Sequence, residues 1–177
     1  MRPDDSEGFR EAWDILERLW KGTVERARAL PEATLHDSVD DEWSFIQTLR
    51  HLGFASAAWV DRMILGRLSP WHPLDLPWDE APGWDGIPWD RDARPSLDEV
   101  LEVRQARQAT VRQVLKSLTD EQLATSVDRP EPGWPQEMDF PVQECLRIVL
   151  NEEWEHRQYA ERDLSVLEKD ATQTKEI

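Results

Sequence analysis

Apolar residues recur at intervals of three and four along four long segments of the chain, which is the pattern of helices that bury one face. The first segment runs from about Ser6 to about Leu30. Its recurring apolar residues are Phe9, Trp13, Leu16, Trp20, Val24 and Ala27. Pro31 follows directly, and proline lacks the N–H that the next helical hydrogen bond needs. The pattern predicts one amphipathic helix that ends before this proline.

Three further segments repeat the same spacing. They run from about Trp43 to Leu68, from Ser96 onward, and from near Val142 to about Glu168. The predicted buried face of the last segment consists of Leu146, Val149, Leu150, Tyr159, Ala160, Leu164 and Leu167. The tail from about 170 to 177 is expected to fray. No alternating strand pattern is visible, so the sequence predicts an all-α protein.

Start signals mark several of these helices. Asp40 or Asp41 is the expected N-cap of the second helix, because an acidic side chain suits the positive end of the helix dipole. Ser96-Leu97-Asp98-Glu99 is a capping box that opens the third helix. Thr119-x-x-Gln122 is a second capping box, and it predicts a short extra turn.

The connection from about Ser69 to Pro95 is unusually long and has no helical period. It holds six prolines and four tryptophans. A connection of this length lets helices two and three run parallel, as in four-helix bundles with a crossover. Two interpretations of its aromatic content stay open: a crossover packed by its own rings, or a lid over a small aromatic ligand. The sequence predicts a single helical-bundle domain over residues 1–177.

Charge and cysteine content narrow the classes of function. The chain has 37 acidic and 21 basic residues, a formal net charge of −16, which repels nucleic acid and anionic lipid. Its single cysteine, Cys145, rules out an intramolecular disulfide and cysteine-rich zinc sites. The N-terminus lacks the apolar core of a signal peptide, and no run is long enough to span a membrane. We therefore expect a cytoplasmic protein that partners neither nucleic acid nor membrane.

Three residues inside the predicted helices have the chemistry of metal ligands. Glu152 and His156 are four residues apart, so they project from one face of the fourth helix, along its largely apolar stripe. His51 lies within the second helix among small neighbours. Two imidazoles and one carboxylate suit a divalent ion and leave coordination positions open. The alternative is a surface Glu–His pair and a hydrogen-bonded core histidine. His36 and His72 fall in predicted loops and are expected to be ordinary surface residues.

Two stretches resemble a known family. Asp41–Leu52 contains Trp43-Ser44 followed by Leu49-Arg50-His51-Leu52, and it resembles the "W-S…L-x-H-L" second helix of DinB-like proteins. Asn151–Leu164 resembles the "E-x-x-x-H…R-D-L" fourth helix of a DinB-like subgroup. That superfamily also contains the mycothiol-dependent maleylpyruvate isomerases. The resemblance covers about residues 6–168.

The resemblance implies an up-down-down-up four-helix bundle with three metal ligands, at His51, Glu152 and His156. Many members carry histidine where this chain has Glu152, whereas the isomerase-type members carry glutamate. Zinc is the first expectation for the metal, with nickel, iron and manganese as alternatives.

The resemblance also implies a transferase or isomerase that uses a low-molecular-weight thiol such as mycothiol or bacillithiol, with a small-molecule substrate. A homodimer would fit its relatives. The alternative is a non-catalytic, stress-associated bundle for binding or dimerisation. Candidates for cofactor contacts around the ligands are Gln47, Thr48, Glu155 and Arg157. Arg162 and Asp163, also part of the family pattern, are expected to form an ion pair or a helix contact.

Overall fold

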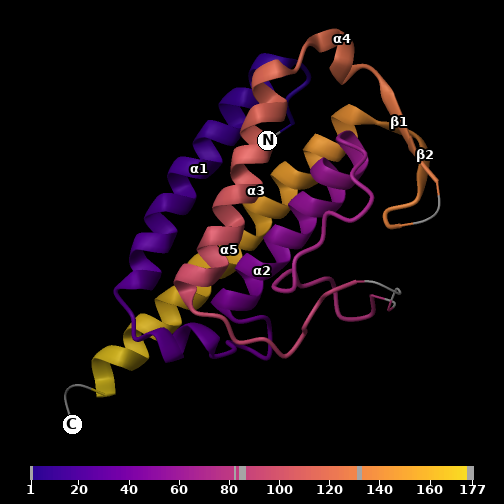
Figure 1. Cartoon of the computed structure of the whole chain (residues 1–177). Helices are drawn as coiled ribbons and strands as arrows, with labels where there is room; N and C mark the ends of the chain where they lie inside the picture. Colours follow the sequence, from indigo (N-terminus) through magenta and orange to yellow (C-terminus); the bar gives the residue numbers. More distant parts are fainter. Residues whose placement is uncertain (1, 82, 84–86, 131–132, 175–177) are drawn as a thin grey trace.

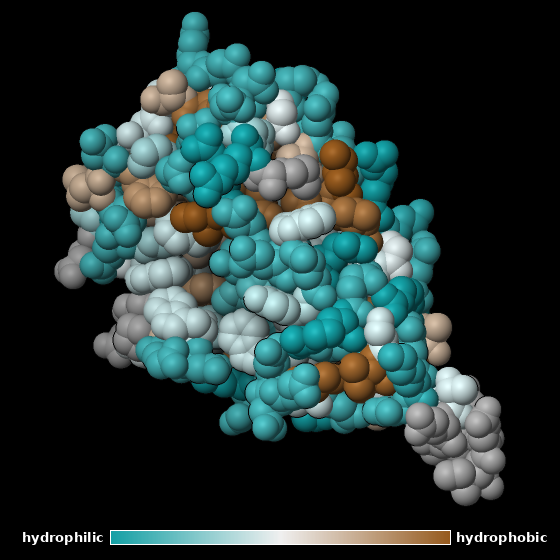
Figure 2. Space-filling view, turned by 180° about the vertical axis from the view of Figure 1, so that it is seen from behind, coloured by the Kyte–Doolittle hydropathy of each residue, from teal (hydrophilic) through white to brown (hydrophobic). Residues whose placement is uncertain are grey.

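The computed structural model describes residues 2–81, 83, 87–130 and 133–174, and Figure 1 shows its long helices lying side by side. The elements are α1 (Ser6–Arg28), the 3-10 helix η1 (Glu32–His36), α2 (Phe45–Ser56), the π-helix η2 (Ala57–Ile64), α3 (Leu97–Ser117), α4 (Asp120–Leu123), β1 (Ser126–Arg129), β2 (Glu137–Pro141) and α5 (Val142–Thr174). Within these residues no helix is both long and apolar enough to cross a bilayer. Hydrophilic residues cover most of the face seen in Figure 2, and hydrophobic residues form small separate groups there.

The first helix, α1, ends two residues before the predicted position. Asp5 caps its start, because the Asp5 Oδ1 accepts a hydrogen bond from the Gly8 backbone N–H at 2.7 Å. At the other end, the Ala29 and Leu30 N–H groups donate three residues back, to Arg26 and Ala27. The helix therefore tightens into a 3-10 turn ahead of the proline.

The second helix, α2, begins at Phe45 with Ser44 as its N-cap, and the predicted caps Asp40 and Asp41 were wrong. Ser44 Oγ accepts from the Gln47 N–H, and Gln47 Oε1 accepts from the Ser44 N–H, which satisfies two otherwise unpaired donors. The two aspartates instead have positive φ angles of 54° and 59°, so they form a turn ahead of the helix. Beyond Ser56 the helix continues as the π-helix η2.

The later helices follow the predicted start signals. Both capping boxes are present, at Ser96 with Glu99 before α3 and at Thr119 with Gln122 before the four-residue α4. The last helix, α5, continues to Thr174, past the predicted end near Glu168. Residues 175–177 of the predicted tail lie outside the described residues.

A two-stranded antiparallel sheet connects α4 to α5, and the sequence analysis missed it. Ser126 pairs with Pro141 and Val127 with Phe140. The strands are only four and five residues long, and neither has a fully buried face, so they carry no clear alternation of polar and apolar residues. The Phe140 ring packs on Trp59 of η2, with ring centroids 5.5 Å apart.

The core consists of two clusters of buried apolar residues. One cluster joins α1, η2, α3 and α5, and the other joins α1, α2, α3 and α5. Representative members are Phe9, Leu16, Val111 and Leu146 in the first cluster, and Trp20, Leu49, Leu101 and Leu164 in the second. Tyr159, which was predicted to face inward, is 47% exposed, so the buried face of α5 is narrower than the apolar pattern suggested.

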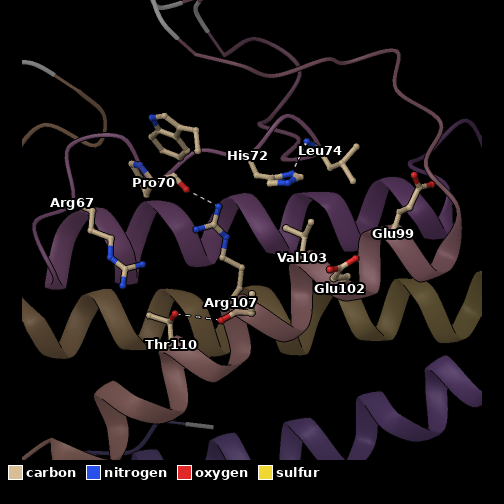
Figure 3. Close-up of a pocket in the computed structure, with 11 residues that line it drawn as sticks. Arg67, Pro70, His72, Leu74, Glu99, Glu102, Val103, Arg107 and Thr110 are labelled. Carbon is tan, nitrogen blue, oxygen red and sulfur yellow. Dashed lines mark hydrogen bonds between the residues drawn. The ribbon is translucent and has the colours of Figure 1, made fainter.

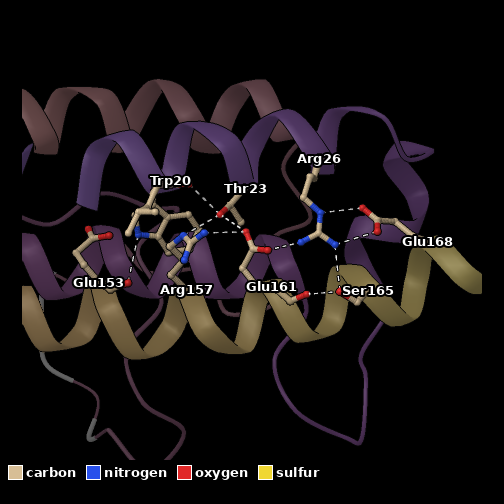
Figure 4. A network of polar contacts seen from close by, with 9 residues as sticks. Trp20, Thr23, Arg26, Glu153, Arg157, Glu161, Ser165 and Glu168 are labelled. Carbon is tan, nitrogen blue, oxygen red and sulfur yellow. Dashed lines mark hydrogen bonds and ion pairs between the residues drawn. The ribbon is translucent and has the colours of Figure 1, made fainter. Parts of the chain in front are cut away.

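An ion pair lies in the interior between α3 and α5. The Arg104 guanidinium donates two hydrogen bonds to the Glu153 carboxylate, at 3.0 and 2.6 Å, and the two side chains are 4% and 2% exposed. The Arg104 guanidinium also lies 4.7 Å from the centre of the Trp20 ring, and the Trp20 indole donates to the Glu153 carbonyl. Figure 4 shows this indole beside Glu153. The pair thereby joins three long helices.

Polar contacts between α1 and α5 continue toward the C-terminal end of α5 (Figure 4). Arg26 of α1 binds Glu161 and Glu168 of α5. Thr23 of α1 accepts a hydrogen bond from Arg157 Nε at 3.0 Å. These pairs are partly exposed, so each contributes little alone and mainly sets how the two helices align.

The crossover between η2 and α3 has no regular helix or strand among its described residues, as the sequence predicted. Arg107 of α3 contacts the crossover and donates to the Pro70 carbonyl at 2.6 Å (Figure 3). The same nitrogen donates to the Asp75 carboxylate at 3.1 Å, and the other terminal nitrogen of Arg107 donates to Asp61 of η2. Asp75 is 1% exposed. Burial raises the pKa of its carboxyl to about 6, although the positive charge of Arg107 opposes this rise.

Breaking the buried Arg104–Glu153 pair should lower the stability of the protein strongly. Replacing Arg104→Met leaves the Glu153 carboxylate buried without a partner, which should lower the free energy of unfolding by about 3–5 kcal/mol in urea denaturation. Arg28→Met, which breaks the exposed pair with Asp98, should cost less than about 1 kcal/mol. The double variant Arg104→Met/Glu153→Leu should recover much of the loss. A small effect of Arg104→Met alone would contradict this account.

Because the pKa of the Asp75 carboxyl is raised in the folded protein, the stability of the protein should depend on pH. Between about pH 6 and the ordinary pKa of 3.8, the folded protein binds a proton at Asp75 that the unfolded chain does not, so this group's contribution to stability rises as pH falls. Relative to Asp75→Asn, which is neutral throughout, the wild type should gain up to about 3 kcal/mol between pH 7 and pH 4. Urea denaturation across this range measures the difference, with exposed Asp79→Asn as the control. A constant difference would show that the carboxyl titrates normally.

Candidate metal centre

Two helices bring His51, Glu152 and His156 to one point. His51 lies on α2, and Glu152 and His156 lie one turn apart on α5, which packs against α2. Each of the three offers a ligand atom, and these atoms all lie within 4.8 Å of one another. Among the described residues, this is the group of histidine and carboxylate side chains that could hold a metal ion.

The distances within the cluster fit a shared ion better than strong hydrogen bonds. His51 Nε2 and His156 Nδ1 each lie 3.3 Å from Glu152 Oε2. Charge-assisted N–H···O hydrogen bonds are shorter, about 2.7–2.9 Å. Two ligand atoms that each lie about 2.1 Å from a tetrahedral zinc ion are separated by roughly 3.4 Å. The two separations from Glu152 Oε2 are therefore close to this value, the three ligand atoms all lie within 4.8 Å of one another, and two imidazoles with a carboxylate are a suitable set of ligands.

Backbone carbonyls orient both imidazoles. His51 Nδ1 lies 2.9 Å from the Leu76 carbonyl of the crossover. Because a carbonyl can only accept, Nδ1 carries a proton, and Nε2 is the nitrogen that faces the Glu152 carboxylate. His156 Nδ1 lies 3.0 Å from the carbonyl of Glu152, one turn earlier. For His51 this is the usual arrangement around protein metal ions, in which the nitrogen that does not face the ion donates to a backbone acceptor, whereas His156 Nδ1 also lies 3.3 Å from the Glu152 carboxylate.

Aromatic rings surround the imidazoles. The Trp43 ring centroid lies 4.5 Å from that of His51 and 6.1 Å from that of His156. Phe54, three residues after His51 on α2, lies 5.8 Å from the His51 ring. These rings cover one side of the imidazoles, while the His156 and Glu152 side chains remain 18% and 31% exposed. In the sequence Trp43 stands out only at the start of the second helical segment and in the family motif, and neither pattern places it beside His51.

Burial and mutual charge set the protonation of the cluster. Burial alone would raise the pKa of Glu152, but the hydrogen bond and charge of His51 and the charge of His156 outweigh it, so the net pKa lies below the ordinary value. Burial lowers the pKa of His156, and the neighbouring charge of His51 lowers it further. Both shifts favour an ionised carboxylate and a neutral imidazole, which are the forms that ligate metals.

The four residues predicted to contact a cofactor lie at different places. Gln47 belongs to the capping box of α2, and Arg157 turns toward Thr23 and Glu161 (Figure 4). Thr48 is buried and Glu155 is exposed, and neither hydrogen-bonds to the three ligand candidates among the described contacts. That these four residues contact a cofactor stays a prediction. The nearest polar neighbour of the cluster, the Leu76 carbonyl, is a backbone group, and no side-chain pattern could have revealed it.

The other predicted residues fall outside the cluster. Asp163 accepts a hydrogen bond from Arg162 Nε at 2.7 Å, as expected. His36 and His72 are partly buried rather than fully at the surface. His72 Nδ1 accepts from the Leu74 N–H, and its ring lines a groove of about 620 Å³ between the crossover and α3 (Figure 3). None of the three ligand candidates lines this groove.

Comparison with known proteins adds one finding. No curated protein and no solved structure matches the chain. A family model, that of the DinB superfamily, matches residues 15–160, which includes all three ligand candidates and most of the helical segments. Because this match spans well over half of the sequence, the chain belongs to the DinB superfamily.

Proposed function

We propose that this protein binds one divalent metal ion through His51, Glu152 and His156, with zinc as the first expectation and nickel, iron or manganese as alternatives. The observation that carries the proposal is the convergence of the three side chains from α2 and α5 within 4.8 Å. The proposal also takes the fold to be an up-down-down-up four-helix bundle. The packing of α2 against both α3 and α5 supports that order.

We further propose that the site serves a thiol-dependent transfer or isomerisation. Three protein ligands leave open coordination positions, as in catalytic rather than structural sites. A metal ion in this site would lower the pKa of a bound thiol and hold it as a thiolate. The protein's own contribution would be to fix the ion through two oriented imidazoles and to limit water through Trp43 and Phe54.

The thiol has to come from outside the chain. Cys145, the one cysteine, is fully buried, and burial raises the pKa of its thiol to about 12. It therefore stays protonated near neutral pH and cannot supply a thiolate. This supports a soluble low-molecular-weight thiol, such as mycothiol or bacillithiol, as the nucleophile.

The crossover supplies aromatic surface next to the cluster. Phe54, which contacts His51, also packs against Trp71 and Trp89 of the crossover and against Trp134 of the hairpin, with ring centroids 5.3–5.5 Å apart. These rings contact one another, as expected for a crossover packed by its own aromatics. Their continuity with His51 supports the second interpretation, in which they also cover a small aromatic substrate.

Metal content tests the site directly. Wild-type protein purified without chelator, or stripped and reloaded, should hold about one equivalent of zinc or another divalent ion by elemental analysis. His51→Ala and His156→Ala should each abolish tight binding, because two remaining ligands hold an ion weakly. His72→Ala removes a partly buried histidine outside the cluster and should bind as the wild type does.

A wild-type protein that takes up less than about a tenth of an equivalent, even with added zinc or nickel, would overturn the metal proposal. A protein that binds metal but transfers no thiol would leave the non-catalytic binding module as the better interpretation. Thiol transfer that survives His51→Ala in a folded protein would exclude the metal as its agent.

The buried cysteine gives an independent prediction. Because its thiol is protonated and shielded, Cys145 should react with an aromatic disulfide reagent at pH 8 only after the protein unfolds. In urea the labelling rate should rise together with the unfolding transition. Cys145→Ala should leave metal content and thiol transfer unchanged. Rapid labelling of the native protein would show that this thiol reaches solvent and could take part in the chemistry.

A further inference from the structure

Arg50, the residue directly before His51, is buried in an unusual way. Its side chain is among the largest that are fully buried, with 2% of the residue exposed. Its guanidinium donates to backbone carbonyls of the crossover. Nε donates to Leu74 at 2.8 Å, one terminal nitrogen donates to Ala93 at 2.8 Å and to Arg91 at 3.3 Å, and the other donates to Asp90.

No carboxylate of the described residues forms an ion pair with this guanidinium. Arg50 is absent from the salt bridges that join Arg26, Arg104 and Arg107 to acidic partners. Burying a cation is costly, and here backbone carbonyls make the direct contacts while the carboxylates of Asp90, Asp75 and Asp92 stabilise the charge from a longer distance. We call this arrangement a clamp, because the planar guanidinium of Arg50, with its fixed donor directions, binds two separate stretches of the crossover, at residue 74 and at residues 90–93.

The clamped segment is the one that contacts the metal-ligand candidate. The Leu76 N–H donates to the Arg50 carbonyl at 3.3 Å, and the Leu76 carbonyl accepts from His51 Nδ1 at 2.9 Å. The segment also lies close against α2. A Cβ added at Gly53 would lie 3.2 Å from Asp75 Oδ1. Arg50 and His51 thus bind neighbouring groups of the same stretch of crossover, the first through its side chain and backbone and the second through its imidazole.

We propose that Arg50 is a positioning residue for the metal site. By clamping the crossover, it holds the Leu76 carbonyl where it accepts from Nδ1 of His51, which turns Nε2 of this ring toward Glu152 and the position of the ion. The part of this inference that concerns metal affinity rests on the proposed function. The structural part, the tautomer of His51, stands independently of any metal.

The test compares Arg50→Lys with Arg91→Lys. Lysine keeps the charge but cannot reach carbonyls in several fixed directions. Arg91 also lies in the crossover, where its carbonyl accepts from Arg50, but its exposed side chain donates to the Trp78 and Ala81 carbonyls and to none of the groups that Arg50 or His51 binds. Circular dichroism checks that each variant keeps its helices.

Two measurements decide the outcome. In metal-free protein, nitrogen-15 spectra of the histidine rings should show His51 protonated on Nδ1 in the wild type and in Arg91→Lys, and as a mixture of forms with and without the Nδ1 proton in Arg50→Lys. Zinc affinity, measured by competition with a chromophoric chelator, should fall by roughly 10–100-fold in Arg50→Lys and stay unchanged in Arg91→Lys.

An unchanged His51 tautomer in folded Arg50→Lys would overturn the proposal. If the wild type binds no zinc, the proposed function fails, yet the tautomer spectra still decide whether Arg50 orients His51. If Arg50→Lys does not fold, Arg50→Gln removes the buried charge and permits the same spectra. A wild-type tautomer in Arg50→Gln would equally refute the clamp.

Discussion

The interior of this protein is organised by one constraint, which is that ionisable side chains on the inward helix faces must find partners where water cannot reach them. The Glu153 carboxylate accepts bidentate hydrogen bonds from the Arg104 guanidinium, and this pair joins α3 to α5. Asp61 and Asp75 share Arg107, which joins η2 and the crossover to α3. The positions of the long helices and of the crossover therefore depend on a few buried charges as well as on apolar packing.

The His51–Glu152–His156 cluster meets the same constraint incompletely. Where Arg104 and Glu153 approach to 2.6 Å, the two imidazole nitrogens stay 3.3 Å from the Glu152 carboxylate. The Leu76 carbonyl binds Nδ1 of His51, which leaves Nε2 of this ring facing the Glu152 carboxylate, whereas His156 Nδ1 lies near both the carboxylate and the carbonyl of Glu152. This wider spacing of histidine and carboxylate atoms, beside aromatic rings, sets the cluster apart from the Arg104–Glu153 ion pair and is the reason that we propose it as a metal site.

The crossover links these features. Without regular secondary structure of its own, it depends on side chains from the helices to hold it, and Arg50 and Arg107 supply them from α2 and α3. In return, its backbone gives His51 a carbonyl acceptor, and its tryptophans extend the aromatic surface that begins at Phe54. A long and apparently irregular connection thus becomes part of the candidate site, which agrees with the general finding that such loops carry function.

The sequence by itself determined the helices, since the spacing of apolar residues and the capping boxes are local signals, and it named His51, Glu152 and His156 because Glu152 and His156 share one helix face. It missed the hairpin from Ser126 to Pro141, whose strands are too short for a pattern, and it placed the α2 cap on aspartates that form a turn. Only the tertiary structure decided how α2 meets α5 and where the Leu76 carbonyl and Trp43 lie. The reason is physical: these contacts join residues distant in sequence, and hydrogen bonds to backbone groups leave no trace in residue type.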